Sequence, residues 1–141
     1  MSVYADTSFF ASLYLRDIHS PDVWRRMNRK PAVWLTALHR AELTHAIERH
    51  VFLHAISPAE AEQVHAAFQR DRENGVWAEC PVSEGAFETC SELGRRHGAD
   101  LGTRTLDALH VASALELRAD SFWTFDKRQA ALARVVGLQT D

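Results

Sequence analysis

The chain has 141 residues, the size of one ordinary domain, and 46% of them are hydrophobic. It contains no apolar run of the roughly 18 residues that a membrane-spanning helix needs and no signal peptide. Its two cysteines, Cys80 and Cys90, are too few for a disulfide framework or a zinc cluster. The length predicts one domain over residues 1–141, and the two isolated cysteines are expected to be reduced, in a cytoplasmic protein. The formal net charge of −3 is not typical of a protein that binds nucleic acid through a basic face.

Short apolar runs alternate with longer helical patterns along the chain. This order is typical of an α/β protein with a mostly parallel sheet. The apolar runs predict strands at Val3–Ala5, Val33–Thr36, Val76–Cys80, Phe122–Phe125 and Val135–Leu138.

The first helix signals are pairs of a capping residue and a proline. Ser20 before Pro21 resembles an N-cap followed by a proline at the first helical position. Ser57 is followed three positions later by Glu60, which completes a capping box. The second of these helices is predicted to end near Glu73, before an Asn-Gly pair.

Two further helices are predicted in the second half of the chain. One begins near Ser83 and is expected to stop at Gly98. The other spans Leu106–Leu117 and is apolar on nearly every side, which indicates a central, well-covered helix.

Four carboxylates are predicted to meet at one edge of the sheet. Asp6 ends the first strand and Asp126 follows the fourth, and ligands of open α/β sheets bind beyond the carboxyl ends of the strands. Glu42 lies in the helix after the second strand, and Asp107 opens the central helix. Each has a plainer reading, because Asp6 and Asp126 can cap helices, Asp107 can complement a helix dipole, and Glu42 can be solvated.

Either bound protons or a bound cation would relieve the repulsion between these carboxylates. At ~4 Å and an effective dielectric constant near 20, each like-charged pair costs about 4 kcal/mol. Oxygen ligands suit Mg²⁺ or Mn²⁺, which can deliver a water to a phosphodiester. The pattern therefore points towards a metal-dependent nuclease or phosphatase.

Four segments in order resemble the PIN domain, and most closely the VapC-type toxins of toxin–antitoxin pairs. They are V-Y-A-D-T-S-F-F, A-L-H-R-A-E-L, T-L-D-A-L-H-V-A-S-A-L and F-W-T-F-D-K-R-Q-A-A-L-A. The resemblance covers essentially the whole chain. It implies a three-layer α/β/α sandwich around a central, mostly parallel sheet of about five strands.

The resemblance also implies an activity and its partners. Asp6, Glu42, Asp107 and Asp126 would hold Mg²⁺ or Mn²⁺, and a metal-activated water would hydrolyse RNA to leave a 5′-phosphate. The hydroxyl side chains expected to support the site are those of Thr7, Ser8 and Thr124. A cognate antitoxin would cover the acidic pocket, and a homodimer is expected, for which Phe52 and Leu53 offer apolar surface.

Basic and histidine side chains are weaker candidates for contacts with RNA. The one dense basic run contains Arg25, Arg26, Arg29 and Lys30 and is either a solvated helix face or a patch that binds the RNA backbone. The sequence assigns no functional role to the histidines near the acidic residues. His39 and His45 are expected to be packed or solvent-exposed, and His110 to be buried and hydrogen-bonded or to approach the pocket.

Three other functions are compatible with parts of the pattern. One is a PIN nuclease of RNA processing outside any toxin pair, and another is a non-catalytic module whose acidic pocket docks an arginine-bearing partner. A haloacid-dehalogenase-like phosphatase would need a second aspartate two residues after Asp6, where this chain has Ser8.

Overall fold

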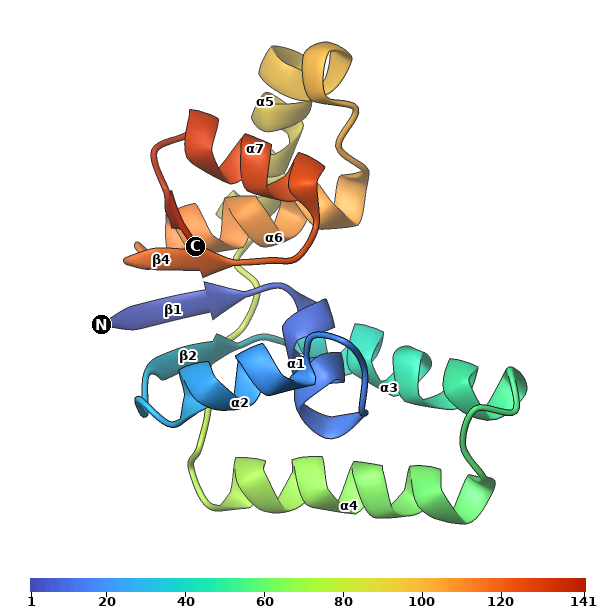
Figure 1. Cartoon of the computed structure of the whole chain (residues 1–141). Helices are drawn as coiled ribbons and strands as arrows, with labels where there is room; N and C mark the ends of the chain where they lie inside the picture. The colour runs from blue at the N-terminus through green and yellow to red at the C-terminus, as the bar shows by residue number, and fades with distance from the viewer.

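The computed structural model describes residues 1–141 and has a sheet of five parallel strands at its centre (Figure 1). The strands are β1 (Ser2–Ala5), β2 (Ala32–Leu35), β3 (Ala78–Glu79), β4 (Ser121–Trp123) and β5 (Gln139–Thr140). Their order across the sheet is β3-β2-β1-β4-β5, and every neighbouring pair is parallel. The chain therefore begins in the middle of the sheet, fills one half and then returns to fill the other.

Helices cover both faces of the sheet, as expected for an α/β/α sandwich. The helices are α1 (Thr7–Tyr14), α2 (Ser20–Met27), α3 (Ala37–Phe52), α4 (Pro58–Glu73), α5 (Glu84–Leu101), α6 (Thr105–Glu116) and α7 (Lys127–Val135). In Figure 1, helices α1–α4 lie on one side of the central strands and α5–α7 on the other. None of these helices is both long and apolar enough to cross a membrane.

The core has two parts, because successive side chains of a strand point to opposite faces of the sheet. Val3 and Ala5 of β1 pack with the residues of α1–α4, whereas Tyr4 between them packs with those of α5–α7. The neighbouring β4 divides in the same way, with Trp123 on the first side and Phe122 on the second. Both faces of the central strands are buried, which explains why their sequences are continuous apolar runs.

Four of the five predicted strands are confirmed, with shifted ends. The predicted second strand loses Thr36, which instead caps α3. The fifth prediction is wrong, because Val135 ends α7 and β5 begins only at Gln139. Gly137 adopts a φ of 91°, and the Leu138 N–H donates to the Ala133 carbonyl at 2.9 Å, so these residues finish the helix rather than start the strand.

The predicted starts of two helices have different outcomes. The capping box is confirmed, because the backbone N–H of Glu60 donates to Ser57 Oγ and the N–H of Ser57 to Glu60 Oε1, both at 3.1 Å. The prediction of Ser20 as an N-cap is wrong, because His19 holds that position. Ser20 is buried, and its hydroxyl donates to the carbonyl of Ser12 at 2.6 Å.

The end of α5 differs from its prediction, whereas α6 agrees with it. The helix passes through Gly98 and ends at Leu101, followed by Gly102 at a φ of 63°. Gly98 lies in ordinary helical backbone, so only the later glycine provides the left-handed position that ends the helix. The predicted central helix is confirmed as α6, in which seven consecutive residues, 108–114, are buried.

Candidate active site

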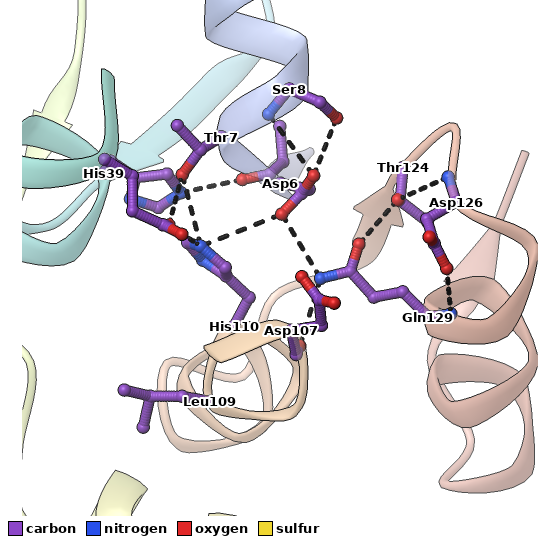
Figure 2. A network of polar contacts seen from close by, with 12 residues as sticks. Asp6, Thr7, Ser8, His39, Asp107, Leu109, His110, Thr124, Asp126 and Gln129 are labelled. Carbon is purple, nitrogen blue, oxygen red and sulfur yellow. Dashed lines mark hydrogen bonds and ion pairs between the residues drawn. The ribbon is translucent and has the colours of Figure 1, made fainter. Parts of the chain in front are cut away.

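Asp6 lies directly after β1, where its carboxylate performs two tasks. Its Oδ2 accepts hydrogen bonds from Ser8 Oγ at 2.7 Å and from the Ser8 N–H at 3.3 Å, and so caps α1. Its Oδ1 faces the other way, 3.3 Å from Gln129 Nε2 and 3.7 Å from His110 Nε2 (Figure 2). The capping reading of Asp6 is therefore correct, yet it leaves one oxygen directed into a polar site.

Glu42 reaches the same site from α3, and two donors hold its carboxylate. Glu42 Oε1 accepts a hydrogen bond from Thr7 Oγ1 at 2.7 Å and a short one from His110 Nε2. Partial burial raises the pKa of Glu42, but the hydrogen bonds from His110 and Thr7 outweigh it and hold that pKa below its usual range. Glu42 is therefore a carboxylate at neutral pH.

His110 lies between the carboxylates of Asp6 and Glu42 and contacts both. The ring is fully buried, and its Nδ1 lies 2.8 Å from the hydroxyl of Tyr4. Burial raises the pKa of Tyr4, so this hydroxyl keeps its proton and can donate it to Nδ1. In that tautomer the Nε2 of His110 carries the hydrogen that Glu42 accepts. The sequence placed His110 one turn after Asp107, and its expected role as a buried, hydrogen-bonded side chain is confirmed.

Asp107 and Asp126 lie at the first turns of α6 and α7. Asp107 Oδ2 lies 3.1 Å from Arg104 Nε, in an ion pair on the surface. Asp126 Oδ1 caps α7 by accepting the Gln129 N–H at 2.8 Å. The hydroxyl of Thr124 accepts the N–H of Asp126 at 3.0 Å, which fixes the turn between β4 and α7.

Gln129 is the residue that joins these elements, and the sequence analysis missed it. The side chain is fully buried, and its Nε2 donates to Asp6 Oδ1 and, at 3.0 Å, to the carbonyl of Asp107. Its Oε1 accepts the hydroxyl of Thr124 at 2.6 Å, as Figure 2 shows. The available signal was its position, because a glutamine three residues after an N-cap completes the capping-box pattern.

Two polar cavities open beside the carboxylates. One, of about 340 Å³, has no hydrophobic residue in its wall, which consists of Gly102, Thr103, Arg104, Asp107, Asp126, Lys127 and Arg128. The other, of about 320 Å³, lies between Glu42 and the start of α6 and shares Arg104 and Asp107 with the first. Glu42, Asp107 and Asp126 thus line space that a ligand can enter, and Asp6 lies close by, at the carboxyl end of β1.

The side chains suit a hard divalent cation in their chemistry. Glu42 Oε2, Asp107 Oδ1 and Asp126 Oδ2 accept no hydrogen bond within the chain. No group of three or more acidic, histidine or cysteine side chains is close enough to enclose an ion by itself. Mg²⁺ usually keeps several waters and uses only one or two carboxylates, so these residues fit such an ion without a closed protein cage.

The dense basic run lies away from this edge of the sheet. Arg25 and Arg26 of α2 both pair with Asp22, and Arg26 also pairs with Asp141 at 2.9 Å. Residues 29 and 30 come just before β2 begins, at the amino ends of the strands. The structure does not bring the basic run to the carboxylates, and its contact with RNA stays a prediction.

Comparisons with known proteins connect the chain to one family. A family model described as the PIN domain matches residues 3–135, while a search of curated proteins found no match. VapC20 of Mycobacterium tuberculosis, described as a toxin that cleaves the sarcin-ricin loop, has a TM-score of 0.72 at 21% identity over 96% of this chain and 95% of its own.

Two further solved structures are similar at lower identity. FitAcB of Neisseria gonorrhoeae has a TM-score of 0.71 at 15% identity, over 98% of this chain and 95% of its own. VapBC2 of Rickettsia felis, bound to a promoter DNA fragment, has a TM-score of 0.70 at 14% identity, over 100% of this chain and 98% of its own. At these identities the likeness establishes a shared fold.

Proposed function

Because the chain belongs to the PIN domain family, we propose that it is a metal-dependent endoribonuclease of the VapC toxin type. The observation that carries this proposal is the gathering of Asp6, Glu42, Asp107 and Asp126 around the carboxyl ends of two neighbouring strands. The free carboxylate oxygens of Glu42, Asp107 and Asp126 and the polar cavities that these three residues line would provide ligands for a cation and room for a phosphodiester.

The four carboxylates would hold Mg²⁺ or Mn²⁺, which supplies an activated water and neutralises charge on the phosphodiester in the transition state. The chain's own contribution is to fix its ligands before RNA arrives. Thr7 and His110 hold Glu42, while Ser8 and Gln129 hold the two oxygens of Asp6. Thr124 holds Gln129 and, through it, aligns α7 with Asp6.

Substitution of Asp6 by asparagine tests this proposal without removing the helix cap, because asparagine and aspartate cap helices equally well. We expect Asp6→Asn and Asp126→Asn to lower RNA cleavage by at least about 100-fold, since a metal ligand stabilises the transition state by several kcal/mol. The assay uses a pool of structured RNAs with Mn²⁺, and the fragments should carry 5′-phosphates and disappear with EDTA. Denaturant melts should show that both variants stay folded.

Two glutamates on neighbouring helices give a matched control. Glu42→Gln should lose cleavage, whereas Glu62→Gln, on the exposed surface of α4, should keep it. Full activity in purified Asp6→Asn would exclude the proposed mechanism. Metal binding without turnover of any RNA in the pool would favour the non-catalytic docking module instead.

An antitoxin is the protein partner that we propose for the same surface. Its support is the likeness to VapBC2 and to a toxin–antitoxin complex of Klebsiella pneumoniae, which has a TM-score of 0.61 at 12% identity. A basic side chain of such a partner would occupy the acidic site and compete with the cation. Co-expression with the product of the adjacent reading frame should give a stable complex without nuclease activity, and an active complex would contradict inhibition at this site.

A further inference from the structure

The cavity between α6 and α7 combines acidic and basic side chains in a way that holding a metal does not require. Its wall includes Arg104, Lys127 and Arg128 in addition to Asp107 and Asp126. Lys127 and Arg128 are exposed and form no ion pair within the chain. In a protein of net charge −3, this placement gathers unpaired positive charge directly beside the candidate metal ligands.

A polar atom in the same wall also has no partner. Thr103 Oγ1 is shielded from solvent and forms no hydrogen bond within the chain. Because this atom is covered, a phosphate in the cavity can accept its hydrogen bond only after the Thr103 side chain rotates towards the cavity. The cavity wall thus offers three cationic side chains, which are groups that hold phosphate oxygens.

Arg104 is the cation of this cavity that already has a partner, and its ion pair is easily exchanged. Its Nε contacts Asp107, and its side chain is 83% exposed. Exposed ion pairs contribute little to stability, so the guanidinium can leave Asp107 at low cost. It also supplies no side-chain cap to α6, so its movement leaves the helix intact.

Phosphate and the carboxylates repel each other at this cavity unless a second cation is present. An ion held by Asp107 and Asp126 would remove that repulsion and, by neutralising the carboxylate of Asp107, would weaken the attraction that holds Arg104 at its Oδ2. The released guanidinium remains at the cavity wall beside Lys127 and Arg128, where it can form two parallel hydrogen bonds with a phosphate.

We propose that this cavity binds a backbone phosphate of the RNA next to the cleaved bond, and that Arg104 exchanges between Asp107 and this phosphate when the metal binds. The inference rests on the proposed ribonuclease function. It assigns Arg104, Lys127 and Arg128 to RNA binding in place of the basic run that ends before β2.

The test is a pair of binding measurements on Arg104→Ala that should change in opposite directions. Mn²⁺ binding, measured by calorimetry without RNA, should tighten about two- to five-fold, because a competing cation has been removed. Binding of a fluorescein-labelled single-stranded phosphorothioate RNA, measured by anisotropy with Mn²⁺ present, should weaken about ten-fold. The slope of log K against log salt should flatten by about 0.7 for the lost phosphate contact.

Matched variants separate this role from a structural one. The double variant Lys127→Ala/Arg128→Ala should flatten the salt slope by about 1.4, whereas Arg70→Ala, on the exposed surface of α4, should change neither measurement. Unchanged RNA affinity in Arg104→Ala, or a joint weakening of Mn²⁺ and RNA binding, would overturn the exchange. If the wild type cleaves RNA while these variants bind it normally, this inference alone fails. If the wild type binds Mn²⁺ but neither binds nor cleaves RNA, the proposed function fails with it.

Discussion

At the scale of single residues, the site depends on buried polar side chains whose hydrogen bonds are satisfied. His110, Gln129 and His39 are all fully buried, and each bonds to a group on another element or at an element's end. A buried polar group without such a partner would destabilise the fold, so each position tolerates few replacements. His110 and Gln129 hold the carboxylates of Glu42 and Asp6 in place, and His39 joins the start of α3 to the end of β1.

Replacing Gln129 by leucine should damage both stability and activity. The change removes the donor to Asp6 Oδ1 and leaves Thr124 without its acceptor, so we expect a loss of about 1–3 kcal/mol in the free energy of unfolding. RNA cleavage should fall about ten-fold or more, because Asp6 is no longer held in place. Denaturant unfolding and cleavage rates check this, with the exposed Gln69→Leu as control. Wild-type activity in a destabilised Gln129→Leu would show that Gln129 supports the fold alone.

His39 should make the protein less stable in mild acid. Burial lowers the pKa of His39 to about 3, and the ring, which accepts the Thr36 N–H at Nδ1 and faces the Ala5 carbonyl at Nε2, is held neutral. In the unfolded chain the pKa of a histidine is about 6.5. At a pH between these two pKa values, the unfolded chain binds a proton that the folded protein does not. The free energy of unfolding therefore falls as the pH falls, by up to about 1.4 kcal/mol per pH unit.

The variant His39→Gln isolates this effect, because glutamine also completes a capping box with Thr36. Its free energy of unfolding, measured by urea titration between about pH 4 and pH 7, should depend less steeply on pH than that of the wild type. His45→Gln, at an exposed position of the same helix, should leave the slope unchanged. Equal slopes in wild type and His39→Gln would rule out His39 as the source.

At the scale of elements, helix termini decide where the functional groups lie. Asp6 and Asp126 cap the helices that follow β1 and β4, so capping places both carboxylates beside the ends of those strands. The left-handed turn at Gly102 lets the chain leave α5 and enter α6 only three residues later, which brings Arg104 and Asp107 to the cavity. The element boundaries therefore determine the composition of the site.

The same substitution at two glycines should have opposite effects on stability. Gly98 is helical, and an added Cβ would meet no atom within 4 Å, so Gly98→Ala should stabilise the protein by about 0.5–1 kcal/mol. Gly102 has a φ of 63°, so Gly102→Ala should destabilise it by about 1–2 kcal/mol. Urea denaturation of the two variants measures both changes. A stabilised Gly102→Ala would mean that α5 does not end there in solution.

At the scale of the whole molecule, the strand order brings distant segments together. Neighbours β1 and β4 are separated by more than one hundred residues of sequence, yet Ala5 pairs with Trp123, and Asp6 follows directly.

The same architecture leaves large apolar side chains in solvent at the junction of α3 and α4, where Phe52 is 78% exposed and Leu53 56%. Such a surface is a reasonable contact for the expected homodimer.

Charged replacements at this junction test the dimer prediction. If Phe52 and Leu53 are covered by a second copy, each buries apolar surface that contributes about 1.5–3 kcal/mol, and Phe52→Lys/Leu53→Lys should dissociate the dimer. Sedimentation velocity measures the change. Ile18→Lys, at an apolar position that is 89% exposed elsewhere on the surface, is the control. A wild-type protein that sediments as a monomer, or a double variant that remains dimeric, would contradict this contact.

The sequence by itself determined the local features of this protein. Apolar runs located β1, β2 and β4 because both faces of these central strands are buried, and the Ser57–Glu60 pattern located α4 because a capping box is formed by neighbouring residues. It also singled out the four acidic residues, since each occupies a position defined by its own element. The boundary at Gly98 was wrong because the backbone conformation of a glycine depends on the path of the chain after it, and nothing in a single residue marks which glycine turns left-handed.

Only the tertiary structure decided which side chains meet at the site. Gln129, His110 and Tyr4 serve the carboxylates through hydrogen bonds that join residues as many as 123 positions apart, and sequence periodicity carries no record of such pairs. Only the tertiary structure decided which of the two basic clusters lies beside the carboxylates. The strands all run in one direction, so residues before a strand and residues after it lie at opposite edges of the sheet. Of the two clusters, the one formed by Arg104, Lys127 and Arg128 lies at the edge that carries the carboxylates.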